Sequence, residues 1–243
     1  MARFYVNQVI VPHSLLDLPE SVVRHLHVLR LRVGDTLTLF DGSGAEFSAE
    51  IQCLEKRYAQ LAIIARHEIS REGPIFIGLA QGISSGERMD FTLQKGVEMG
   101  VNVFQPLSTE RTIVRLSGER AERKVERWQE IVLAACEQSG RNIIPVVHPI
   151  MSFEAWLREA QQHAAGARWI LSPQGTVSLA QQAQPSTVWL MVGPEGGFSE
   201  AEAHAACTAG WRTLRLGARV LRTETAALAA VAAIQTRWGD YGA

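Results

Sequence analysis

From residue 75 onward, the chain alternates between short apolar runs and longer segments in which apolar residues recur with helical spacing. The apolar runs have the length of strands and read IFIGLA, VNVFQPLS, IIPVVHPI, RWILS, VWLMV and RTLRL. Helices are predicted between and after them, over 90–99, over 119–138, around Trp156, from Ser199 and over 225–234. This alternation predicts an α/β fold with a parallel sheet covered on both faces, and the pattern alone favours a doubly wound arrangement.

The first 72 residues are predicted to form a separate β-rich domain. DTLTLF and AEFSAEIQCL are joined by DGSG, a hairpin signal in which Gly42 and Gly44 supply positive φ, and AQLAIIA is a further strand. One helix is expected near its start, where Asp17 and Glu20 have the spacing of a capping box. The polar stretch SREGP ends in Gly-Pro and suits a boundary, so the predicted domains are 1–72 and 73–243.

Composition excludes several classes of protein. The formal net charge of -1 gives no global basic field, so any affinity for nucleic acid must come from local patches. The three cysteines are far apart and contain no CxxC pair, which argues against a disulfide framework or a zinc site, and no metal is expected. No apolar run approaches the roughly 20 residues of a membrane span, and no leader opens the chain, so the protein is expected to be soluble and cytoplasmic.

The loop after VWLMV is the first candidate site. It contains Gly193, Pro194, Glu195, Gly196 and Gly197, and a capping box of the S-x-x-E type then opens a helix. The loop contains neither a Walker phosphate motif nor the G-x-G-x-x-G dinucleotide fingerprint. Because ligands of parallel α/β sheets lie at the carboxyl ends of strands, such a loop is either a plain turn or a close approach to a ligand.

The second candidate site is the segment before the last helix. Thr223 is predicted to cap that helix, and Glu224 in its first turn suits the helix dipole. Arg219 and Arg222 remain unexplained, because a helix N-terminus repels cations and an unpaired guanidinium is costly to bury. They require an anionic partner, which is Glu195 or Glu224 within the protein or else a ligand; the residues leave both possibilities open.

Basic residues outside these loops suggest contacts with nucleic acid. RHLHVLRLR, residues 24–32, is either an ordinary charged helix surface or a patch that faces RNA. Arg141 lies just past a helix end, where it either complements the dipole or binds a phosphate.

Four motifs together resemble the RsmE-type family of small-subunit (16S) ribosomal RNA (uracil-N3-)methyltransferases, of the SPOUT class. The motifs are GERMDFTLQKGVEMGV, AACEQSGRN, MVGPEGGFSEAE and LRLGARVLRTETAALAA, and the resemblance covers nearly the whole chain. It implies a PUA-like β-barrel before a SPOUT domain with a C-terminal trefoil knot, S-adenosylmethionine as cofactor, a homodimer formed through the SPOUT domain, and the small ribosomal subunit as substrate. Two departures, Ser85 for a basic residue and Ala218 for proline, put one substrate contact and one cofactor loop in doubt.

The resemblance, together with the chemistry of the residues and of the implied reaction, gives expected roles for individual residues. It assigns the cofactor to Met191, Gly193, Glu195, Gly196, Gly197, Leu216, Gly217, Val220, Leu221 and Thr223. The predicted RNA-binding residues are Arg24, His25, Arg30, Arg32, Arg111 and Arg141. Arg219, Arg222 and Glu224 are the predicted catalytic residues: one arginine stabilises the uracil anion, the other holds a flanking phosphate, and Glu224 or Glu195 positions them or accepts the proton.

Three other functions are compatible with parts of this sequence. A non-catalytic RNA-binding protein would have no need to retain Gly193, Glu195, Arg219 and Arg222. A Rossmann-type dehydrogenase would require the dinucleotide fingerprint. The third is a related SPOUT enzyme that methylates transfer RNA or a ribose hydroxyl. Residue chemistry does not exclude this alternative, and only the match to the four motifs argues against it.

Overall fold

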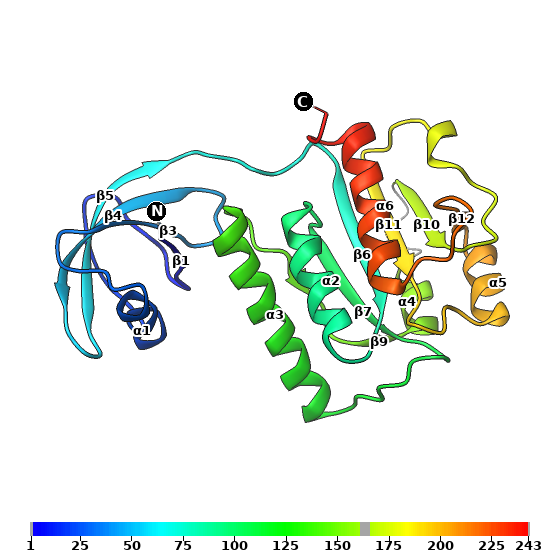
Figure 1. The fold of residues 1–243 in the computed structure, drawn as a ribbon, viewed down its shortest axis with the longest axis horizontal. Coiled ribbons are helices and arrows are strands. Elements are labelled where there is room, and N and C mark those ends of the chain that lie inside the picture. The colour runs from blue at the N-terminus through cyan, green and yellow to red at the C-terminus, as the bar shows by residue number, and fades with distance from the viewer. Residues whose placement is uncertain (1, 161–165, 243) are drawn as a thin grey trace. The chain divides into compact units, whose positions relative to one another are not determined.

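The computed structural model describes residues 2–160 and 166–242. The chain forms two compact units, which Figure 1 draws as a ribbon. The first unit consists of Met1–Glu72 together with Cys136–Ile144, and the second of Gly73–Ala135 together with Pro145–Ala243.

The first unit contains a five-stranded sheet and one helix. The sheet has the order β1-β3-β4-β5-β2, with β1 parallel to β3 and the other pairs antiparallel. Its elements are β1 (Arg3–Tyr5), β2 (Leu15–Asp17), α1 (Glu20–Val28), β3 (Thr36–Phe40), β4 (Glu46–Leu54) and β5 (Ala59–His67). Alternate residues of β4, such as Phe47 and Ile51, are buried against Leu26 of α1 and Leu61 of β5, as expected for a sheet that buries one face.

The turn prediction in this unit is confirmed, and the capping prediction is wrong. Gly42 and Gly44 adopt φ of 87° and 98°. Asp17 does not cap α1, because it lies in β2 and its carboxylate accepts hydrogen bonds from Tyr58 and Gln60. The residue that precedes α1 is Pro19, which makes no side-chain cap hydrogen bond.

The segment Cys136–Ile144 belongs to the first unit, whereas the sequence places it in the second domain. The buried Arg141 explains this packing, because its guanidinium donates to both carboxylate oxygens of Glu72, with Nε 3.0 Å from Oε1. Asn142 also donates to the carbonyl oxygen of Ile69 at 2.7 Å. Ion pairing of this kind joins segments far apart in sequence, so periodicity could not predict it.

The second unit contains a seven-stranded sheet in which every described pair is parallel. Its strand order is β12-β10-β11-β6-β7-β8, and β9 also pairs with β7. The strands are β6 (Phe76–Gly82), β7 (Val103–Ser108), β8 (Val146–Val147), β9 (Met151–Ser152), β10 (Ala167–Leu171), β11 (Thr187–Val192) and β12 (Arg212–Leu214). The expected parallel α/β sheet is thus confirmed.

Helices cover both faces of this sheet. They are α2 (Glu87–Glu98), α3 (Glu119–Ser139), α4 (Phe153–Ala160), the short 3-10 helix Leu179–Gln181, α5 (Glu200–Thr208) and α6 (Thr223–Trp238). On one face, Trp156 of α4 and Ala206 of α5 pack with Trp189 and Met191 of β11. On the other face, α6 lies beside α2 and against β6 and β11 (Figure 1).

Candidate methyl-donor site

A cavity of about 640 Å³ lies at the carboxyl ends of β10, β11 and β12. Because the three strands are parallel and adjacent, their following loops meet at one edge of the sheet, where α/β proteins bind ligands. The lining comes mainly from the three segments 170–174, 192–200 and 213–224. Its size is within the usual range for a small-molecule site, about 300–1,000 Å³.

Glycines let the loop after β11 fold back on itself. A Cβ on Gly193 would lie 2.8 Å from the carbonyl carbon of Gly197, so only glycine fits there. The loop then enters α5 through the predicted capping box, which is confirmed. The Ser199 backbone N–H donates to Glu202 Oε2 at 2.9 Å, and the Glu202 N–H donates to Ser199 Oγ at 3.2 Å.

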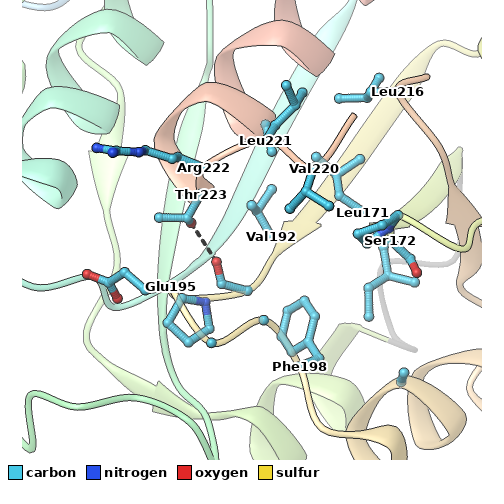
Figure 2. Close-up of a pocket in the computed structure, with 18 of the residues that line it drawn as sticks. Leu171, Ser172, Val192, Glu195, Phe198, Leu216, Val220, Leu221, Arg222 and Thr223 are labelled. Atoms are coloured by element: carbon cyan, nitrogen blue, oxygen red, sulfur yellow. Dashed lines mark hydrogen bonds between the residues drawn. The ribbon is translucent and has the colours of Figure 1, made fainter. Parts of the chain in front are cut away.

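Thr223 joins the start of α6 to the loop after β11. The prediction that Thr223 caps α6 is wrong: Arg222 is the N-cap residue and Thr223 is the first helical residue. The buried Thr223 hydroxyl donates instead to the Gly193 carbonyl at 2.5 Å, drawn as the dashed line in Figure 2. Gln81, fully buried at the end of β6, donates to the same hydroxyl at 2.9 Å. Three segments distant in sequence are therefore fastened under the cavity.

The Glu195 carboxylate is already engaged by donors from another loop. Its Oε1 accepts from the Ser85 backbone N–H at 2.8 Å, the Ser85 hydroxyl at 2.6 Å and Arg88 Nη1 at 2.7 Å. Partial burial alone would raise the pKa of Glu195, but the hydrogen bonds from the Ser85 hydroxyl, from backbone N–H groups and from Arg88 outweigh it and lower the pKa to about 2. A carboxylate this acidic is a poor proton acceptor near neutral pH.

Arg219 and Arg222 line the cavity and are exposed, and within the part of the chain that the structure describes neither side chain has a hydrogen bond or an ion pair with protein. Glu195 and Glu224 are thus excluded as their partners in this structure. Glu224 is half-buried, and its Oε2 is buried without a hydrogen-bond partner among the described residues. Both guanidinium groups are therefore available to a ligand, and one buried carboxylate oxygen beside them has no partner among the described residues.

The cavity has an apolar end and a charged end (Figure 2). Leu171, Leu216, Val220 and Leu221 gather on one side with Ser172, and the Glu195 and Arg222 side chains lie on the opposite side. Such a division suits a ligand that has a ring system and a charged group.

The structure brings most of the predicted cofactor and catalytic residues together. The cavity is lined by Gly193, Glu195, Gly196, Gly197, Leu216, Gly217, Val220, Leu221, Thr223, Arg219, Arg222 and Glu224. Met191 is a correction, because it is fully buried in the core among aromatic side chains and its neighbour Val192 faces the cavity instead. Sequence reasoning missed the segment 170–174, although a Ser-Pro-Gln-Gly turn directly after a strand was a usable signal.

The predicted RNA-binding residues have three different environments. Arg111 lines the cavity, where its Nη1 donates to the Gly196 carbonyl at 2.8 Å. Arg24, His25, Arg30 and Arg32 are exposed in the first unit. For Arg141 the prediction of a phosphate contact is corrected, because its side chain is 4% exposed and bound to Glu72.

The described residues contain no cluster of histidine, cysteine and carboxylate side chains able to hold a metal ion. No helix within 2–160 or 166–242 combines the length and the apolar character needed to cross a membrane.

Comparison with known proteins identifies the class to which this fold and site belong. A family model described as an RNA methyltransferase domain matches residues 71–235, and a model described as an RNA methyltransferase PUA domain matches residues 18–64. The class is therefore that of RNA methyltransferases with an N-terminal PUA-like sheet domain.

Individual relatives narrow the class. The chain is 34% identical to ribosomal RNA small subunit methyltransferase E of Bacillus subtilis, over 96% of each chain. It is 48% identical to that of Neisseria gonorrhoeae, whose crystal structure is bound to S-adenosyl methionine, with a TM-score of 0.93 and 99% of each chain covered. A methyltransferase of Legionella pneumophila, in complex with the same cofactor, is 40% identical with a TM-score of 0.93 over 98% of each chain. The chain belongs to the ribosomal RNA small subunit methyltransferase E family.

Proposed function

We propose that the protein transfers a methyl group from S-adenosylmethionine to N3 of one uridine in small-subunit ribosomal RNA. One observation carries the proposal: a glycine-lined cavity is bordered by two arginines and a glutamate oxygen that have no partner in the described protein. Family membership supports the cofactor and the RNA class.

The cavity fits the cofactor. Its glycine loop allows close approach of a ligand to backbone, its aliphatic end suits an adenine ring, and the Glu195 carboxylate suits the amino group and the sulfonium. The residues that would hold the cofactor are those of segments 170–174 and 193–198, together with Leu216, Gly217, Val220, Leu221 and Thr223. S-adenosylmethionine, when bound, supplies a methyl group on a positively charged sulfur, so no metal is needed to activate it.

The protein's own residues must make the uridine nitrogen nucleophilic. N3 carries a proton at neutral pH, and its loss leaves a negative charge that is shared with the two flanking carbonyl oxygens. A guanidinium beside those oxygens stabilises the charge where it develops, and we assign this role to Arg219 or Arg222, with the other arginine on a flanking phosphate. Since Glu195 is held by three donors and is strongly acidic, we assign the role of proton acceptor to Glu224, whose Oε2 has no hydrogen-bond partner among the described residues.

The trefoil knot expected for this class is part of the proposal. Leu214 of β12 pairs with Leu171 of β10 on one side and with Val177 on the other. Val177 N donates to Thr213 O at 2.9 Å, and Arg215 N donates to Val177 O at 3.1 Å. These contacts hold β12 between β10 and the segment that follows it, and this arrangement supports the proposal of a C-terminal knot.

A homodimer and an RNA-binding first unit complete the proposal. Leu228, Ala229 and Ala232 of α6 are only partly buried, and an apolar helix surface of this kind suits a second copy of the chain. Sedimentation at equilibrium tests this: a monomer at micromolar concentration would refute it. The PUA family match supports a barrel-like domain that contacts RNA. A ribosomal substrate supports a cytoplasmic location as part of the same proposal.

Mass spectrometry of ribosomal RNA tests the activity directly. Small subunits from cells that lack the gene should gain one N3-methyluridine when incubated with the purified protein and S-adenosylmethionine. Methylation of a ribose hydroxyl or of transfer RNA would instead indicate a related activity.

Single substitutions then test the assigned roles in the same reaction. Arg222→Ala and Glu224→Gln should each lower kcat by about 10²–10³, with cofactor affinity changed by less than about threefold. Arg158→Ala, which removes an exposed arginine of α4, is the matched control and should leave kcat unchanged. Full activity of both variants would refute the assignment.

A further inference from the structure

The connection after β7 forms a turn whose arginine borders the cavity. Thr109 and Thr112 are both buried, and the Thr109 N–H donates to Thr112 Oγ1 at 2.9 Å. Between them, Glu110 and Arg111 are exposed. The two threonines thus anchor the turn and present Arg111 at its outer side.

Glu202, in the first turn of α5, holds this turn in place. Glu202 is only 5% exposed, and its Oε2 accepts the hydrogen bond from the Ser199 N–H that caps α5. Oε1 accepts from the backbone N–H of Glu110 at 2.8 Å, so a capping carboxylate also binds a segment ninety-two residues earlier in the chain. Arg115 Nη2 donates to the carbonyl oxygen of Glu110 at 3.2 Å, which also holds the next peptide group of the turn.

Arg111 completes the connection between the turn and the cavity. Its Nη1 donates to the Gly196 carbonyl at 2.8 Å, and its aliphatic stem lies 3.2 Å from the position that a Cβ on Gly196 would take. The other N–H groups of this guanidinium make no hydrogen bond among the described residues. They are therefore available to an anionic substrate at the cavity mouth.

We propose that Glu202 is a positioning residue that acts through Arg111, holding the turn 109–112 so that Arg111 meets the RNA backbone beside the methyl-donor site. The inference rests on the proposed function and deepens it, since it names the residue that orders a substrate-facing wall. A capping box needs only one acceptor from its N3 residue and accepts Glu or Gln equally, so the second bond of Glu202 is not explained by the helix cap.

Glu202→Gln separates the two bonds. The glutamine carbonyl still serves the Ser199 N–H, but its NH₂ group faces the N–H of Glu110 and cannot accept from it. The KM for small-subunit RNA should rise about tenfold, the effect of one lost hydrogen bond to a charged group, while cofactor affinity changes by less than about threefold. Glu154→Gln, in the first turn of α4 and exposed, is the matched control and should leave both values unchanged.

A double-mutant cycle shows whether Glu202 acts through Arg111. In an Arg111→Ala background, Glu202→Gln should raise KM by less than about twofold, because the positioned group is already absent. Effects that multiply across the two sites would overturn the proposal, and so would an unchanged KM in Glu202→Gln.

Limited proteolysis distinguishes failure of this inference from failure of the proposed function. Release of the turn should speed tryptic cleavage after Arg111 and Arg115 about tenfold in Glu202→Gln, whether or not the protein is active. Unchanged cleavage would refute the role of Glu202 in holding the turn, and would leave the proposed function untouched. A wild-type protein that methylates no small-subunit RNA would refute the proposed function, even if the turn is released as expected.

Discussion

The hydroxyl of Thr223 is expected to stabilise both the fold and the cofactor site. It donates to the Gly193 carbonyl and accepts from Gln81 Nε2, and all three groups are buried. Thr223→Val keeps the shape and removes the hydroxyl. Gly193 O then keeps only the long contact of 3.5 Å from Gln81, whereas Gln81 keeps its 3.0 Å bond to the Gly82 carbonyl.

The magnitude follows from the two impaired partners. A buried polar group that loses its hydrogen bond costs about 1–3 kcal/mol, and here each partner keeps part of its bonding, so the loss is about 2–4 kcal/mol. For a domain of this size, 1 kcal/mol lowers Tm by roughly 2–4 °C, which gives a Tm about 4–16 °C lower. Affinity for S-adenosylmethionine should also fall about tenfold or more, because Gly193 and Thr223 border the cavity.

Calorimetry measures both effects, by scanning for Tm and by titration for the cofactor. Thr223→Ser is the control: it retains the hydroxyl and loses one methyl group, which costs about 1 kcal/mol. The reasoning is refuted if the valine variant is as stable as the serine variant and binds the cofactor equally well.

Two further predictions concern charge. The pKa of Glu195 is lowered to about 2 from a usual value of 4.5, so the stability that its charged form contributes is fully present above pH 4.5 and is lost as pH falls from 4.5 through 2. The difference in unfolding free energy between wild type and Glu195→Gln should therefore be present at pH 7 and smaller at pH 3. A difference that does not change with pH would contradict this prediction. Replacing Arg24, Arg30 and Arg32 with glutamine should flatten the salt dependence of RNA binding by about two in the slope of log K against log salt, measured by filter binding, and an unchanged slope would exclude these arginines from the RNA contact.

The helices and strands of the second unit and the glycine-rich loop 193–197 could be predicted from the sequence alone. The parallel sheet followed from strand-length apolar runs that alternate with amphipathic segments, because a strand buried on both faces must be apolar throughout. The capping box at Ser199 was also readable, because its two hydrogen bonds join residues only three apart. Local chemistry is predictable from local sequence.

The two helix starts near the cavity show the limit of that reasoning. Ser199 caps α5 as its spacing predicts, yet Thr223, an equally good capping residue, gives its hydroxyl to Gly193. A competing acceptor from another strand decides the outcome. Met191 shows the same limit, since alternation along β11 turns it toward the aromatic core and turns Val192 toward the cavity.

By itself, the sequence determined which residue types stand at the carboxyl ends of the strands and which loops have backbone free enough to approach a ligand. Only the tertiary structure decided how the charges are paired. Arg141 is bound to Glu72, Glu195 to Ser85 and Arg88, and Arg219 and Arg222 remain without protein partners among the described residues. The physical reason is that an ion pair depends on distance in space, and the strand order 12-10-11-6-7-8 brings together side chains that lie more than a hundred residues apart in the chain.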